Sequence, residues 1–189
     1  MQVDVSRRAL LVALARAALA PSSAALAAPP DDLPGWRQAR WGMTAAELEA
    51  AFRGEIKPAE RGLDYNRLVV RQTIPRATVA GRPFIVLFQL DRKSGRLAQI
   101  LLQFRGRRPT HTDSVAVLQA LEAELGRPLD GRHESDYSGS FPSFSVEWLW
   151  RFKTTSVRLR YTDPNADPNS RPRKELLIRW FPTAAKALS

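Results

Sequence analysis

The chain has no cysteine, only 2 histidines and only 2 methionines among its 189 residues. Without cysteine there can be no disulfide, no thiol catalysis and no lipidated cysteine anchor, so packing alone must stabilise the fold. His111 and His133 are predicted to lie in separate loops, with no other histidine at a chelating spacing. A zinc site normally needs three or four protein ligands. The sequence therefore predicts neither a metal site nor a cofactor.

Lysine is scarce too, and the basic excess is almost wholly arginine. The chain contains 29 basic and 19 acidic residues, a formal net charge of +10. Such an arginine bias arises either from the composition of a GC-rich genome or from a selected anion-binding surface. Both explanations stay open at this point.

Residues 1–27 have the pattern of a cleaved signal peptide. Arg7 and Arg8 precede an apolar run, Pro21 breaks it, and Ala25-Leu26-Ala27 has the small residues that signal peptidase requires. A membrane-anchoring helix would need about 20 uninterrupted apolar residues, and Arg16 interrupts this run. General secretion and the twin-arginine route both fit. We expect a periplasmic or secreted protein.

Cleavage after Ala27 leaves a mature chain, 28–189, with 26 basic and 18 acidic residues and a net charge of +8. Its length suits one domain. The Pro/Asp-rich segment 28–35 is predicted to be a disordered tail and 36–189 a single domain. No transmembrane segment is expected after cleavage, and export makes nucleic acid a poor candidate partner.

A helix is predicted to begin at Thr44. Thr44 and Glu47 have the spacing of a capping box, in which each side chain accepts a hydrogen bond from the backbone of the other residue. Met43 and Leu48 stand where a hydrophobic staple packs, and Gly54 favours a helix end near Arg53. A second helix is expected over 113–125, because four apolar residues recur there at helical spacing.

Alternation of apolar and polar residues predicts six strands and a polar loop. The strands are expected over 68–73, 83–90, 97–105, 144–152, 157–161 and 176–180, and the loop over 130–140. The predicted fold is α+β: one antiparallel sheet of about six strands, with two helices packed on one face. The order of helix, three strands, helix and three strands also suggests two αβββ halves.

The helix start Trp41-Gly42-Met43-Thr44, with Glu47-Leu48, and the later Leu125-Gly126-Arg127-Pro128 carry a resemblance. They resemble a group of small exported bacterial α+β proteins, mostly uncharacterised, and are similar to BamE/SmpA-like assembly lipoproteins and β-lactamase-inhibitor-like modules. The resemblance implies a non-catalytic role in binding proteins or envelope components and no site residues. The missing cysteine departs from the lipoprotein pattern.

Four arginines form the candidate binding site. Arg158 and Arg160 share one strand face, while Arg151 and Arg179 fall on the polar phases of their own strands. Such a group of like charges is expected to bind a carboxylate or phosphate, presented by an envelope protein, an anionic lipid or an acidic glycan. The alternative is a solvated basic face with no ligand.

The sequence thus predicts an exported, non-catalytic envelope protein that acts as a binding or assembly module. The alternative is a hydrolase or lyase that acts on envelope polymers through Glu134 and Asp136 in the polar loop. Binding is preferred because enzyme sites usually need several convergent polar groups. Here the polar residues are spread along alternating strands.

Overall fold

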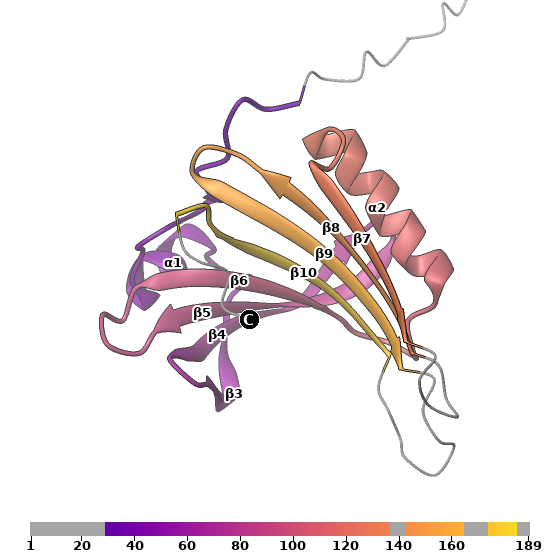
Figure 1. Cartoon of the computed structure of the whole chain (residues 1–189). Coiled ribbons are helices and arrows are strands. Elements are labelled where there is room, and N and C mark those ends of the chain that lie inside the picture. Colours follow the sequence, from indigo (N-terminus) through magenta and orange to yellow (C-terminus); the bar gives the residue numbers. More distant parts are fainter. Residues whose placement is uncertain (1–28, 137–142, 165–173, 185–189) are drawn as a thin grey trace, which may run out of the picture.

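A computed structural model describes residues 29–136, 143–164 and 174–184. The predicted signal peptide lies outside these ranges. Over the described residues the chain forms ten strands and two helices (Figure 1): β1 (Gly35–Trp36), β2 (Ala39–Arg40), α1 (Ala45–Ala51), β3 (Lys57–Tyr65), β4 (Leu68–Val79), β5 (Arg82–Asp91), β6 (Leu97–Phe104), α2 (His111–Leu125), β7 (Asp130–Asp136), β8 (Ser143–Arg151), β9 (Thr155–Pro164) and β10 (Glu175–Pro182). Neither described helix is long and apolar enough to cross a membrane.

The predicted α+β fold with a sheet of about six strands is wrong. The protein is mostly β: eight strands form one antiparallel sheet in the order β3-β4-β5-β6-β10-β9-β8-β7, and β1 pairs with β2 separately. Helix α1 has only 7 residues and α2 has 15. Within the large sheet, the two strands that the sequence analysis missed are β3 and β7, which lie at its two edges and consist largely of charged residues and glycine.

Strand β7 replaces most of the predicted loop over 130–140. Its sequence DGRHESD has no apolar alternation, yet its backbone pairs with β8 from Asp130↔Leu149 to Asp136↔Ser143. An edge strand needs only backbone pairing on one side, and charged side chains there block edge-to-edge aggregation. Such strands escape a search for apolar alternation.

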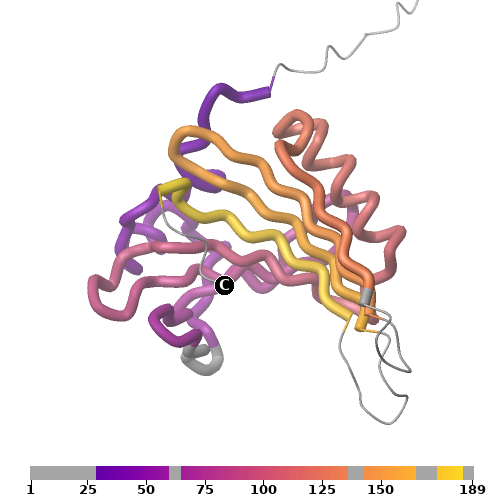
Figure 2. The backbone as a smooth tube through the Cα atoms, in the orientation of Figure 1, coloured from indigo at the N-terminus to yellow at the C-terminus, as the bar shows by residue number. Residues whose placement is uncertain are grey.

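The chain forms two αββββ halves instead of two αβββ halves. The first half is α1 with β3–β6, and the second is α2 with β7–β10. Each half is a four-stranded meander, and the last strands of the halves pair antiparallel in the middle of the sheet, for example at Ile178↔Leu102. Figure 2 shows β10 beside β6 at this junction. One continuous sheet therefore joins the halves.

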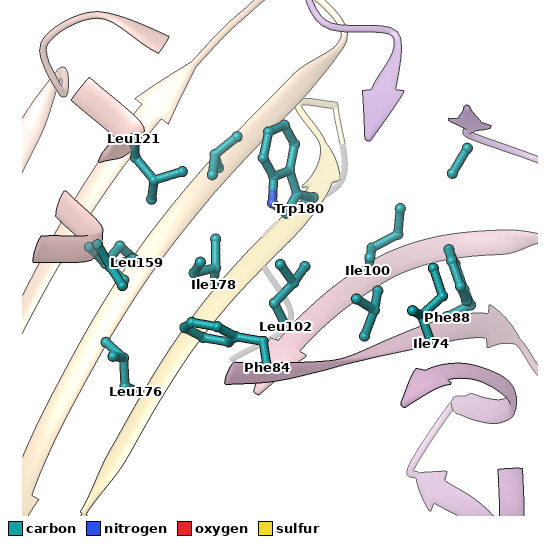
Figure 3. Close-up of a cluster of buried hydrophobic side chains, with 14 of the residues drawn as sticks. Ile74, Phe84, Phe88, Ile100, Leu102, Leu121, Leu159, Leu176, Ile178 and Trp180 are labelled. Carbon is teal, nitrogen blue, oxygen red and sulfur yellow. The ribbon is translucent and has the colours of Figure 1, made fainter. Parts of the chain in front are cut away.

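The main core lies between the helices and one face of the sheet, which we call the helix face. Phe52 at the end of α1 contacts Phe88 of β5, with ring centroids 5.3 Å apart. From the second half, Leu121 of α2 points toward the sheet near Leu159 of β9 (Figure 3). Buried side chains from both halves belong to the same cluster: Leu48, Phe52, Phe84, Val86, Phe88, Ile100, Leu102, Val117, Leu121, Leu125, Trp150, Val157, Leu159, Tyr161, Leu176, Ile178 and Trp180. Each full burial contributes about 1.5–3 kcal/mol.

Both helices begin with a capping box. The predicted box at Thr44 is confirmed: its backbone N–H donates to Glu47 Oε2 at 2.7 Å, and its hydroxyl accepts from the Glu47 N–H at 3.3 Å. Thr110 and Asp113 form a second box, so α2 begins at His111 and not at 113. Asp113 also pairs with Arg82 of β5, which fastens α2 to the sheet.

The segment predicted to be a disordered tail contacts the turn between β8 and β9. Asp32 Oδ1 accepts hydrogen bonds from the backbone N–H of Thr154 at 2.9 Å and from its hydroxyl at 3.0 Å. The carbonyl oxygen of Leu33 lies 2.6 Å from the same hydroxyl and is the alternative acceptor for its single hydrogen. These contacts join residues 32 and 33 to partners 121 or more residues away in the sequence.

Candidate functional site

The face of the sheet opposite the helix face carries the candidate arginines, and we call it the open face. Side chains alternate between the two faces along each strand. Because Leu159 and Ile178 belong to the helix-face core, their sequence neighbours Arg158, Arg160 and Arg179 point to the open face. The same alternation on β8 places Arg151 on the open face, opposite to buried Trp150.

Strand pairing brings the predicted arginines together. Arg158 lies directly opposite Arg179, and Arg160 is two residues further along β9, opposite Leu177. We call Arg158, Arg160 and Arg179 the arginine cluster. Arg151 lies opposite Ser156 at the end of β8, one diagonal step of about 7–8 Å from Arg158. Sequence alternation alone could not establish the direct pair, since it depends on the register of β9 and β10.

The arginine cluster concentrates positive charge at a half-buried position. Burial, and then the positive charges of Arg158 and Arg160, lower the pKa of the Arg179 guanidinium below its ordinary value. Arginine nevertheless stays protonated in proteins. The three guanidinium groups therefore repel one another at a partly buried position.

Two residues that the sequence analysis did not assign to the site hold Arg158 in place. Its Nε lies 3.3 Å from Oε1 of Glu147, and its guanidinium lies over the ring of Phe181 at 5.6 Å. Glu147 is also directly opposite Arg160 in the register. Glu147 shares the alternation phase of Arg151 on β8, which is the signal that could have identified it.

The other two guanidinium groups of the cluster have no such partner. Among the residues that the structure describes, Arg160 and Arg179 form no ion pair or hydrogen bond with a side chain or carbonyl. Glu147 forms its ion pair with Arg158, and the negative charges of Glu147 and Glu175 only partly offset the repulsion on Arg179. The arginine cluster keeps an excess of positive charge that can attract an anion.

A shallow pocket of about 210 Å³ adjoins the cluster on the open face. It is lined by Arg132, Glu134, Ser145, Glu147 and Arg160. Glu134, which the hydrolase alternative placed in a polar loop, instead lies on strand β7 opposite Ser145. The side chain of Asp136, its proposed companion, lies outside what the structure describes. The pocket therefore combines basic and acidic groups from three neighbouring strands.

The two histidines are not in loops. His111 is the first residue of α2 and His133 lies on β7, and their rings approach Phe144 edge-on at centroid distances of 5.8 and 4.7 Å. Pairing of His133 with Val146 in the register positions it there. No group of three or more histidine, cysteine, aspartate or glutamate side chains that could hold a metal ion occurs within the described part of the chain.

The open face of the first half is apolar where it meets the arginine cluster. Val70, Leu87, Leu101 and Leu177 form a second buried cluster there. In the register, Leu87 lies opposite Leu101, and Leu101 lies opposite Arg179. One row across the sheet thus changes from leucine to arginine at the junction of the halves.

A scan of the chain against protein-family models finds no match, and searches of curated proteins and of solved structures find none either. The resemblance to BamE/SmpA-like and β-lactamase-inhibitor-like modules therefore stays a prediction. The candidate site rests on its own geometry.

Proposed function

We propose that this protein is an exported, non-catalytic binding module of the cell envelope, which docks an acidic partner protein on the open face of its second half. The observation that carries the proposal is the arginine cluster, in which Arg158 and Arg179 lie directly opposite each other. Like charges in directly opposed positions destabilise a sheet. A carboxylate from a partner offsets that repulsion and can engage arginine in a bidentate pair.

A protein partner fits the surroundings of the cluster better than a lipid or a glycan. Buried Leu101 and Leu177 adjoin the arginines, and Glu147 stands among them. Arginine beside apolar side chains is typical of protein interfaces. A uniformly anionic membrane surface repels the Glu147 carboxylate beside the cluster. A protein partner can instead place a cation opposite this carboxylate.

The test measures binding of a poly-glutamate peptide to the purified protein at low and moderate salt. The double variant Arg160→Gln/Arg179→Gln should bind at least about tenfold more weakly, since each charge-assisted pair is worth about 1.5–3 kcal/mol. Added salt should weaken binding to the unchanged protein, because exposed charges are screened over about 8–10 Å.

The matched control is Arg71→Gln/Arg76→Gln, which removes the same two charges from exposed positions on β4 in the first half. It should leave peptide affinity within about twofold, because any long-range charge effect is screened. Equal losses in both double variants would show that net charge alone drives binding and would contradict the proposal. Binding to phosphatidylglycerol vesicles or alginate with no binding to the peptide would also contradict it.

A further inference from the structure

The middle of the sheet opens where β6 and β10 separate. The ladder between these strands ends at Leu177↔Gln103, whereas β10 continues to pair with β9 as far as Glu175↔Thr162. Beyond Gln103 the chain stays with β5, since Phe104 pairs with Phe84. We call this separation the fork. A cleft of about 410 Å³ occupies it.

The cleft passes between the strands and is not a hollow on one face. Gln103 and Leu177 contribute to its lining from the open face, and Phe104 and Leu176 contribute from the helix face. Successive side chains point to opposite faces of a sheet, so only an opening between strands collects both sets. The partly exposed ring of Phe104 gives the cleft an apolar surface, and the buried Leu176 and Leu177 side chains pack behind the lining.

The loop after β6 closes one side of the cleft and depends on a glycine. A Cβ on Gly106 would lie 3.2 Å from Cε1 of Phe104, so a larger residue would crowd this ring. The Phe104 ring itself packs edge-on against Phe84, with centroids 5.8 Å apart. This packing holds the Phe104 ring in place. Arg107 and Arg108, which follow Gly106, lie at the rim of the cleft.

The rim of the cleft has an excess of positive charge. Arg107 and Arg108 line it and are exposed, and within the described ranges neither guanidinium forms an ion pair or hydrogen bond. Lys174 also lines the cleft, but its Nζ lies 2.5 Å from Oδ2 of Asp163, which balances its charge. Glu175 is the one carboxylate among the described residues that line the cleft.

We infer that the fork binds a small amphipathic anion, whose carboxylate or phosphate pairs with Arg107 and Arg108 and whose apolar body lies against the ring of Phe104. The volume lies in the range of about 300–1,000 Å³ that is typical of small-ligand sites. Guanidinium groups bind both anions in bidentate geometry. The Gln103 amide adds a neutral hydrogen-bonding group at the cleft. This site is separate from the arginine cluster and stands whether or not the cluster binds a protein.

The test is calorimetric titration of the purified protein with octanoate and with octyl phosphate. Each is an anion with an eight-carbon chain, and at least one should bind saturably with one site per chain. The double variant Arg107→Gln/Arg108→Gln should weaken that binding by at least about tenfold, because both charge-assisted contacts are lost. The side chains of Arg107 and Arg108 are exposed, so this double variant should fold normally.

The matched control Arg105→Gln/Arg127→Gln removes two exposed charges that do not line the cleft, and it should retain the affinity within about twofold. Octanol and inorganic phosphate should each bind at least about tenfold more weakly than the better amphipathic probe. Tighter octanoate binding indicates a fatty carboxylate as the natural ligand, and tighter octyl phosphate binding indicates a lipid phosphate. No saturable binding, equal loss in both double variants, or undiminished binding of octanol would overturn the inference.

Discussion

The two halves of the molecule share an order of elements but differ on the open face. Each begins with a helix capped by threonine and a carboxylate, continues as a four-stranded meander and ends at the central junction. On the open face the first half presents the buried Leu87 and Leu101 with a hydrogen-bonded glutamine pair. The second half presents the arginine cluster. The helix face maintains the fold in both halves, and the open face is where they have become chemically different.

The glutamine pair sharpens this contrast. Gln99 Nε2 donates to Gln89 Oε1 at 2.6 Å, and both side chains are buried. Buried polar groups are tolerated when they are paired. This pair thus satisfies its polar groups internally, whereas the arginine cluster keeps an excess of positive charge that an external anion can balance.

The largest effects are expected from truncation of the shared core. Phe88→Ala in the first half and Leu159→Ala in the second should lower the free energy of unfolding by about 3–5 and about 2–5 kcal/mol, respectively. Because one sheet and one core join the halves, each variant should still unfold in a single transition. Urea denaturation followed by tryptophan fluorescence and circular dichroism checks this, and two separate transitions would mean that the halves are independent domains.

Loss of the helix caps should have a smaller effect in both halves. Thr44→Ala and Thr110→Ala each remove a hydroxyl that accepts a backbone hydrogen bond and should cost about 0.5–2 kcal/mol. Thr44→Ser and Thr110→Ser keep the hydroxyl and serve as controls in the same denaturation experiment. If Thr44→Ala lost binding to the poly-glutamate peptide while its denaturation midpoint stayed unchanged, Thr44 would belong to a ligand site instead.

Removal of one charge from the arginine cluster should leave stability unchanged or increase it. Arg179→Met keeps an aliphatic stem and ends the repulsion from Arg158 and Arg160, so the free energy of unfolding should rise by 0 to about 1 kcal/mol. The comparison is Leu101→Met, directly across the junction, where no charge is removed and a cost below about 1.5 kcal/mol is expected. A loss above about 2 kcal/mol in Arg179→Met would make the cluster a structural feature and not a binding surface.

The two caps should also produce a small dependence of stability on acid pH. Hydrogen bonds from Thr44 hold the pKa of Glu47 below its ordinary 4.5. Burial raises the pKa of Asp113, but hydrogen bonds from Thr110 and Arg82 outweigh it and leave the value below 3.8. A lowered pKa in the folded state stabilises the protein above the unfolded pKa, and that contribution disappears as the pH falls through the folded value.

The free energy of unfolding should therefore decrease as the pH falls from about 5 to about 2. Glu47→Gln and Asp113→Asn should each flatten part of this decrease, and Asp113→Asn should also lose the ion pair with Arg82. Denaturation midpoints measured across this pH range check the effect. If the denaturation midpoint of the unchanged protein rose as the pH fell toward 2, the lowered pKa values assigned to Glu47 and Asp113 would be contradicted.

Much of the helix face could be predicted because its signal is local. Alternation identified the strands that bury one face, and the spacing of Thr44 and Glu47 identified the first cap. The second cap was missed because Asp113 stands where glutamate or glutamine is usual. The edge strands β3 and β7 lack apolar alternation, so the sheet has eight strands and not six.

The candidate site could be predicted only in part. Alternation places Arg158 and Arg160 on one face, because neighbours two residues apart in a strand share a face. That Arg179 lies opposite Arg158 depends on the pairing of β10 with β9. The contact with Glu147 likewise depends on a neighbouring strand.

The sequence by itself determined which side chains face the core, where α1 begins and which side chains carry the positive charge, since each depends on residues close together in the chain. Tertiary structure alone decided that β6 and β10 join the two halves and that these strands separate to open a cleft beside Arg107 and Arg108. Both are matters of strand register between segments about 75 residues apart. Register follows from how whole faces pack against the helices and not from any local pattern.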